Sequence, residues 1–199
     1  MTRDEFVNIH WRYYIMLEKS FDKILQYVEL DEKNYPTFSI EFARQLQGIC
    51  AEIDTVMKVI CEIDSDDRAN MKSYQPIIIS KYKDIINKEV TIRNKSIKPY
   101  GTWAKDKPTQ SLPWYRDYNK LKHSRTTSFK VANLKNVLYA LAGLFLLEMY
   151  YTREVAQEGE RDIPLPASEL FYITDWQTMY STLSNCVIKH TDKRAEFKE

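Results

Sequence analysis

"VLYALAGLFLL", residues 137–147, is the stretch that decides the fold, because it is apolar on every side of a helix. The run ends at Glu148 after eleven residues, whereas a membrane-spanning helix needs about 20. In a globular protein, a helix that is apolar all round is buried on every side. We therefore expect residues 130–156 to form the central helix of a bundle, and we expect no membrane association.

Two further long helices are predicted upstream, each with one apolar stripe. Apolar residues recur every three or four positions between residues 2 and 30 and again between residues 38 and 64. The first stripe comprises Phe6, Ile9, Tyr13, Leu17, Phe21, Ile24 and Val28, and the second comprises Phe38, Phe42, Leu46, Ile49, Ile53, Val56 and Ile60. This spacing places one face of each helix against a core. The short break between the two helices favours an antiparallel hairpin.

The remaining segments are less regular. Residues 74–92 are expected to form a shorter helix, and residues 93–111, which contain Pro, Gly, Ser and Thr, to form a long loop. The predicted fold class is all-α, with a long-helix up-and-down bundle over residues 1–160 that carries a basic loop and motif at 93–135. An irregular C-terminal segment, 161–199, is expected to pack on this bundle and to end in a charged tail.

The composition indicates a globular protein of 199 residues with 44% hydrophobic residues, and its four glycines argue against a turn-rich all-β fold. Cys50, Cys61 and Cys186 form no CxxC pair and are odd in number, which favours buried, reduced thiols in a cytosolic protein. The first ten residues, "MTRDEFVNIH", carry charges where a signal peptide would be apolar. A cytoplasmic location is therefore expected.

Charge is concentrated in one segment. Residues 93–135 contain eleven Lys or Arg and two acids, a net charge of +9, whereas the other 156 residues contain 18 basic and 26 acidic residues, a net charge of −8. The segment also contains Tyr100, Trp103, Trp114, Tyr115 and Tyr118. Basic groups interleaved with aromatic rings suit an unpaired nucleic acid. The alternative is a basic loop that pairs with the acidic remainder of the same protein or of its dimer mate.

The centre of the basic segment is "LPWYRDYNKLKHSR", residues 112–125. Pro113 fits the first turn of a helix, and Ser111 is a candidate cap for it. Arg116 and His123 are seven residues apart, almost two helical turns, so they point the same way. Asn119 and Lys120 fall between them on the same face.

This face carries the groups that phosphodiester cleavage needs. A histidine can move a proton near neutral pH, and an arginine can hold phosphate oxygens bidentately. RNA supplies its own nucleophile, the 2′-OH, so the chemistry requires neither a metal nor another cofactor. No set of metal ligands is visible in the sequence, because His10 and His190 stand alone and are expected to be surface or packing residues.

The stretch "RDYNKLKH" resembles the Arg–x(4–6)–His motif of the HEPN superfamily, with Arg116 and His123 as the pair. Asp117 fits the polar residue that commonly follows the motif arginine. The wider pattern of a tryptophan, "YN", "KH" and an arginine is similar to HEPN-like bacterial proteins, as are long helices such as "FSIEFARQLQGICAEIDTVMK" (38–58). One position departs from HEPN toxins paired with nucleotidyltransferase antitoxins: Arg125 stands where they have a tyrosine. Regulation through that tyrosine is therefore not expected.

The resemblance implies a helical bundle, often dimeric, in which two motifs meet at the interface. It also implies a metal-independent endoribonuclease in a toxin or phage-defence role, which cleaves RNA through its own 2′-OH and has an antitoxin or another defence protein as partner. We accordingly expect a homodimer. The alternative is a catalytically silent HEPN-like module that binds RNA, a nucleotide or a protein partner.

Three groups of residues make up the predicted site. The catalytic residues are Arg116, His123 and Asn119; the residues expected to contact RNA are Lys120, Lys122, Arg125, Tyr115 and Trp114; the supporting residues are Asp117 and Asp54. Asp54 lies beside the apolar stripe of its helix, and a partly buried carboxylate needs a partner. Either it pairs with Lys58, four residues later, or it helps to hold Arg116 or His123.

Overall fold

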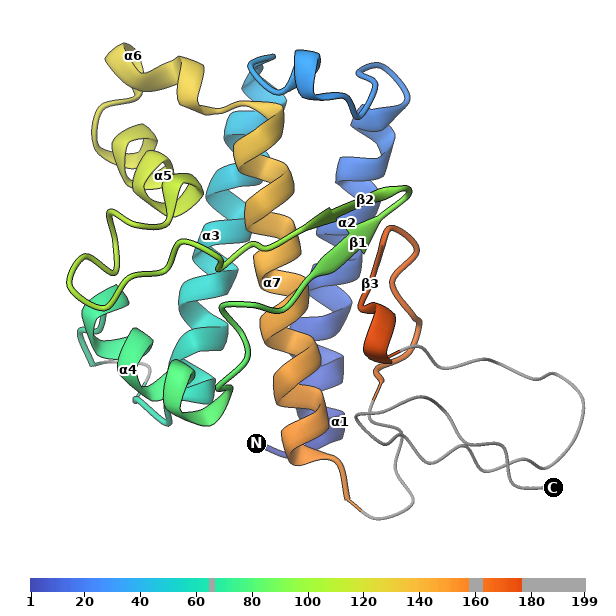
Figure 1. Cartoon of the computed structure of the whole chain (residues 1–199), viewed down its shortest axis with the longest axis vertical. Helices are drawn as coiled ribbons and strands as arrows, with labels where there is room; N and C mark the ends of the chain where they lie inside the picture. The colour runs from blue at the N-terminus through green and yellow to red at the C-terminus, as the bar shows by residue number, and fades with distance from the viewer. Residues whose placement is uncertain (65–66, 158–162, 177–199) are drawn as a thin grey trace, which may run out of the picture.

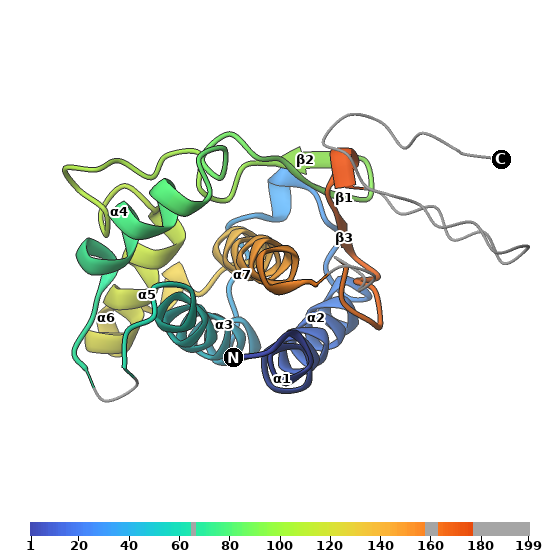
Figure 2. The ribbon, with the colours of Figure 1, turned by 90° about the horizontal axis from the view of Figure 1, so that it is seen from below.

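A single apolar helix, α7 (Leu134–Val155), forms the centre of the molecule. The structure, a computed structural model, describes residues 1–64, 67–157 and 163–176. Figure 2 shows α7 enclosed by the other elements, and its side chains from 137 to 147 are buried except for Tyr139, which is half-buried. The helix begins where the Asn133 side chain accepts the backbone N–H of Asn136. The prediction of a central helix over about 130–156 is therefore confirmed.

The two helices predicted upstream are present and form an antiparallel hairpin (Figure 1). The first is composed of α1 (Arg3–Phe6), a π-helical turn (Val7–Trp11) and α2 (Arg12–Leu25), and the second is α3 (Ile40–Ile60). The connection between them contains a short 3-10 turn, Glu32–Asn34.

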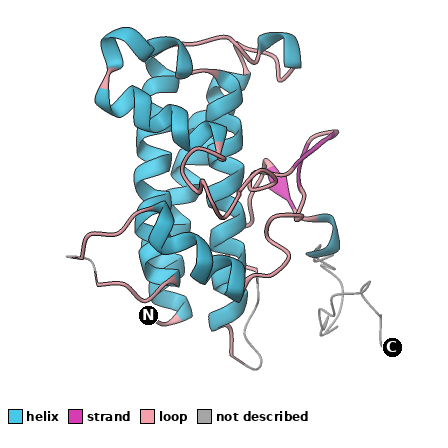
Figure 3. Cartoon of the chain, turned by 60° about the vertical axis from the view of Figure 1, so that its left-hand side comes forward, coloured by secondary structure: helices cyan, strands magenta, loops and turns pink. Residues whose placement is uncertain are grey.

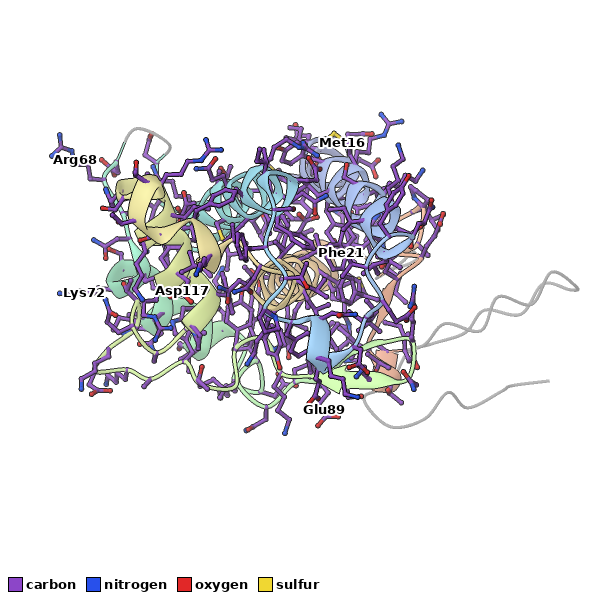
Figure 4. The ribbon with its side chains drawn as sticks, turned by 90° about the horizontal axis from the view of Figure 1, so that it is seen from above. Met16, Phe21, Arg68, Lys72, Glu89 and Asp117 are labelled. Carbon is purple, nitrogen blue, oxygen red and sulfur yellow. The ribbon has the colours of Figure 1, made fainter. Side chains whose placement is uncertain are left out.

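The π-helical turn moves the buried face of the first helix by one residue, because a π turn holds one residue more than an α turn. Ile9 and Tyr13, which belong to the predicted apolar stripe, are therefore exposed. Trp11 and Tyr14 are buried instead, and Phe21 farther along lies in the interior beside α7 (Figure 4).

Helices α3 and α7 run parallel, so the bundle is not a simple up-and-down one. Their first residues lie together, since the Leu134 N–H donates to the Thr37 carbonyl over 2.9 Å. Their last turns also lie together, because Lys81 forms ion pairs with both Glu62, just after α3, and Glu154 in α7. The long connection from residue 61 to residue 133 makes this arrangement possible, because it returns the chain to the end at which α3 begins (Figure 1).

This connection contains a small sheet that the all-α prediction did not include. It starts with α4 (Met71–Lys81), shorter than the helix predicted over 74–92, and continues into β1 (Val90–Ile92) and β2 (Lys95–Ile97). The two strands form a hairpin in which Arg93 has a positive φ of 51°. β3 (Phe171–Tyr172) pairs with the other edge of β1, giving the order β2-β1-β3 (Figure 3).

The described part of the C-terminal segment is held against α2 by a buried carboxylate. Glu18 of α2 accepts hydrogen bonds from the Ser168 hydroxyl and from the backbone N–H groups of Glu169 and Leu170. A 3-10 turn, Thr174–Trp176, follows β3. The charged tail lies outside the described residues.

Cys50 and Cys61 are buried and unpaired, as predicted, and Cys186 lies outside the described residues.

In the part of the chain that the structure describes, no helix combines the length and the apolar character that crossing a bilayer requires.

Candidate functional site: the polar face of α5

The predicted motif lies on a helix of its own, α5 (Pro113–His123), which packs against α3 and α7. Pro113 occupies the first turn as predicted. Ser111 does not cap the helix. The residue before Pro113 is Leu112, which has no capping side chain, and the Ser111 hydroxyl instead accepts the backbone N–H of Ala104.

The inner face of α5 is composed of large side chains that belong to the core: Trp114, Tyr115, Tyr118 and Leu121. The Trp114 indole N–H donates to the Pro99 carbonyl over 2.9 Å, and the Tyr115 hydroxyl donates to Asp54 over 2.9 Å. The expectation that Trp114 and Tyr115 contact RNA bases is therefore wrong, because both rings are enclosed and have their polar atoms bonded inside the protein. Helical periodicity alone places Trp114 nearly opposite the Arg116–His123 face, whereas it places Tyr115 beside that face, so only the tertiary structure encloses Tyr115.

The outer face brings together four of the predicted residues. Lys120 and His123 are exposed, whereas Arg116 and Asn119 are half-buried. His123 is the last residue of α5, and its ring forms no hydrogen bond with any residue that the structure describes. The Asn119 amide donates to the Tyr115 carbonyl one turn earlier, over 3.1 Å, and thus does not orient His123.

Asp117 organises the cations of this face. Its Oδ1 accepts from Arg116 Nε at 3.0 Å and from Lys120 Nζ at 3.2 Å, and its Oδ2 accepts from Asn136 Nδ2 at 3.2 Å. Burial raises the pKa of Asp117, but the hydrogen bonds from Arg116, Lys120 and Asn136 outweigh it and leave the pKa below its ordinary value. Figure 4 shows Asp117 on α5, on the side toward α7, which carries Asn136.

Asn136 is the member of this network that sequence reasoning missed. Asn136 is buried, and its side-chain amide also donates to the Val131 carbonyl over 2.8 Å. This second hydrogen bond fixes the orientation of the amide that donates to Asp117. Asn136 lies on α7, on the next long helix, and no spacing in the sequence relates it to the motif. Its only signal is a polar residue at the start of an otherwise apolar helix.

Asp54 supports α5 through an aromatic residue. Neither of the predicted partners is bound to it: Lys58 donates to the Asp67 carbonyl over 2.7 Å, and Asp54 accepts from Tyr115 instead of contacting Arg116 or His123. Burial raises the pKa of Asp54, although the Tyr115 hydrogen bond and the nearby charges of Lys122 and Lys58 act in the opposite direction.

The other predicted RNA contacts, Lys122 and Arg125, are exposed beside His123. The Lys122 ammonium lies 5.9 Å from the centre of the Tyr118 ring. Arg125 opens the next short helix, α6 (Arg125–Ser128), and its guanidinium lies 5.9 Å from the centre of the Phe129 ring, in the 3-10 turn Phe129–Val131. Together with Lys120, they provide cations that a polyanion can reach.

No metal site accompanies this face in the described ranges 1–64, 67–157 and 163–176, where no group of three or more His, Cys, Asp or Glu is placed to hold an ion. His10 is a buried packing residue whose Nδ1 lies 2.6 Å from Glu52, and His190 lies outside the described residues. The outer face of α5 presents cations beside one exposed imidazole, and such cations can bind a phosphate.

Comparison with known proteins gives no match, whether to family models, to curated proteins or to solved structures.

Proposed function

We propose that the protein is a metal-independent endoribonuclease of HEPN type, with a toxin or phage-defence role, which cleaves RNA through the substrate's own 2′-OH. One observation carries the proposal. Arg116 is oriented through Nε by Asp117, and its two Nη groups form no hydrogen bond with any described residue. Arg116 lies seven residues before the exposed His123, on the same face of α5. Such a guanidinium can hold two oxygens of one phosphate while the imidazole transfers a proton.

The cleavage step forms one bond and breaks another at phosphorus. The 2′-oxygen attacks the adjacent phosphorus and loses its proton to a general base, and the 5′-oxygen leaves with a proton from a general acid. The products are a 2′,3′-cyclic phosphate and a 5′-hydroxyl. Arg116 stabilises the charge that develops on the non-bridging oxygens. The nucleophile is the substrate's own hydroxyl, so no step requires a metal ion.

The step uses both a base and an acid, whereas α5 presents one histidine. A symmetric homodimer would supply a second Arg116–His123 pair. The contact surface of this dimer would have to include the outer face of α5, because Trp114 and Tyr115 are already enclosed in the core.

A second candidate function is binding without cleavage, by a catalytically silent module that holds RNA, a nucleotide or a protein partner. One observation favours it: no described residue forms a hydrogen bond with the His123 ring, and the side-chain amide of the neighbouring Asn119 is bonded to its own helix. A catalytic histidine usually has a partner that fixes its ring.

Substitution of the pair tests the proposal. Purified protein is incubated with total and defined RNAs in EDTA, and the fragment ends are analysed. Arg116→Ala and His123→Ala should each lower the rate by about 10²-fold or more, the double variant should add little, and products should end in 2′,3′-cyclic phosphate or 3′-phosphate. Asn119→Ala should cost less, because water can replace an orienting amide.

The matched control is Arg12→Ala, which removes an exposed arginine from α2, on the opposite side of the bundle from α5 (Figure 2). Each variant must keep the melting temperature of the unaltered protein. A folded His123→Ala protein with full activity would refute the catalytic proposal, and RNA binding without cleavage by the unaltered protein would establish the silent module. Sedimentation at micromolar concentration tests the dimer, and a monomer would contradict it.

A further inference from the structure

Two phenylalanine rings lie at the surface where α3 and α7 begin. Phe38 comes just before the Ser39 cap of α3, in extended backbone that bridges to Asn133, and its side chain is 43% exposed. The half-buried ring of Phe129 meets it edge to face, with centroids 5.8 Å apart. Phe38 was predicted to belong to the core, but α3 starts after it, so the helical periodicity does not apply to it.

Phe129 is the accessible ring of the basic segment. All residues from 93 to 135 are described, and among the phenylalanine, tyrosine and tryptophan rings of this range only Phe129 is not buried. The interleaving of basic and aromatic residues in the sequence therefore does not translate into a row of exposed rings. Within this range, an unpaired base can therefore stack only on Phe129, which Phe38 meets edge to face.

The surroundings of this ring pair are cationic. Arg125 lies over the Phe129 ring at 5.9 Å, Lys130 is exposed next to Phe129 in sequence, and Lys135 is exposed in the first turn of α7. The sequence contains no acidic residue between Asp117 and Glu148. Acidic residues border this surface. Glu41, which is paired with Arg44, lies three residues after Phe38, and Glu32 and Asp31 lie close enough to Tyr35 to raise its pKa, after the larger effects of burial and Tyr139.

The ring pair is continuous with the polar face of α5. His123 ends α5, Arg125 begins α6, and the turn that carries Phe129 packs back against α5. Figure 1 shows α6 above α5, with the chain passing from there to the top of α7. A strand whose phosphates lie along Arg116 and Lys120 can therefore reach Arg125 and the rings without leaving the basic surface.

We propose that Phe38 and Phe129, with Arg125 beside them, form a stacking subsite for an unpaired base of single-stranded RNA bound along α5. The proposal rests on the proposed function and narrows its substrate class from RNA in general to unpaired RNA. Base stacking on an aromatic ring is tolerant of sequence, because every base has a π face. A duplex keeps its bases stacked on one another and offers only phosphates and hydroxyls to this surface.

The test measures affinity for two probes. One is a short single-stranded 2′-O-methyl oligonucleotide containing 2-aminopurine, which lacks the nucleophilic hydroxyl and stays intact, and the other is a duplex of the same length. Phe38→Ala should weaken single-strand binding about 5- to 100-fold and abolish the quenching of 2-aminopurine, whereas Phe38→Trp should retain both. Duplex affinity and the salt dependence should not change, because no phosphate contact is lost.

The matched control is Tyr172→Ala, which removes an aromatic side chain of similar exposure, 39%, from β3. If Phe38→Ala binds and quenches like the unaltered protein, the subsite is refuted and the proposed function stands. If the unaltered protein binds neither probe, both proposals fail. If Phe38→Ala dissociates a dimer while the affinity per protomer stays constant, the rings are a protein interface and this proposal is wrong.

Discussion

Asp117 and Glu148 both carry a carboxyl group, but their surroundings shift the two pKa values in opposite directions. Asp117 accepts three hydrogen bonds and has a lowered pKa. Glu148 is fully buried within α7, and neither of its oxygens is bonded to a described residue. Burial raises the pKa of Glu148 well above its ordinary value, and the charge of Glu52 raises it further.

The raised pKa of Glu148 predicts that the unfolding free energy decreases as the pH rises. The folded protein keeps a proton on Glu148 that the unfolded chain releases above about pH 4.5, its ordinary pKa. The unfolding free energy should therefore fall as pH rises from there toward the raised pKa, by about 1.4 kcal/mol per pH unit. Glu148→Gln should remove this slope and unfold at higher urea concentration than the unaltered protein at pH 8.

Urea unfolding at several pH values between 5 and 8 checks this prediction. The Asp117→Asn variant is the contrast, because a lowered pKa contributes stability that is present above the unfolded pKa and is lost only in acid. Its slope between pH 5 and 8 should match that of the unaltered protein. Parallel profiles for Glu148→Gln and the unaltered protein would show that Glu148 is not the titrating group.

At the scale of elements, Gly143 determines how closely α7 approaches the loop beneath α5. A Cβ atom at this position would lie 3.3 Å from the Tyr100 hydroxyl and 3.4 Å from Trp114 Cζ2. Neither ring can move easily, because the Tyr100 hydroxyl donates to the Gly143 carbonyl and the Trp114 indole to the Pro99 carbonyl. Because Gly143 has no side chain, α5, α7 and the loop that carries Tyr100 can pack in direct contact.

Alanine substitution separates this packing role from helix propensity. Gly48 in α3 is the matched position, because a Cβ there would meet Leu17 and Tyr13 at ordinary distances of 3.6 and 3.7 Å. Gly48→Ala should stabilise the protein by about 0.5–1 kcal/mol through helix propensity. Gly143→Ala should lower the unfolding free energy by about 1–3 kcal/mol, because overpacking outweighs the gain in helix propensity. Thermal melts compare the two variants, and equal stabilisation would refute the packing argument.

At the scale of the whole molecule, the uneven charge predicts how RNA binding responds to salt. Bound counterions are released when lysine and arginine neutralise phosphates, so affinity should fall steeply with salt. Replacing Lys120, Lys122 and Arg125 together with Gln should weaken binding to all RNA sequences. The slope of log affinity against log salt should flatten by about two units. A triple variant that keeps the slope of the unaltered protein would place the RNA elsewhere.

Features that depend on neighbouring residues in the chain could be predicted from the sequence. The long helices, the antiparallel hairpin and the shared face of Arg116 and His123 all follow from periodicity within one segment. Helical geometry decides which side chains point the same way without any partner. The exposure of Lys120, His123 and Arg125 follows similarly, since charged side chains opposite an apolar stripe remain in water.

Only the tertiary structure decided features that join distant segments. β3 pairs with β1 from about eighty residues later in the chain, and Asp117 accepts a hydrogen bond from Asn136 on another helix. Asp54 meets Tyr115 instead of Lys58 because α5 packs across α3 and brings the hydroxyl to the carboxylate. The same packing encloses the aromatic rings of the basic segment and leaves Phe38 and Phe129 at the surface. Such pairings depend on how folded helices fit against one another, and a local pattern contains no information about the partner surface.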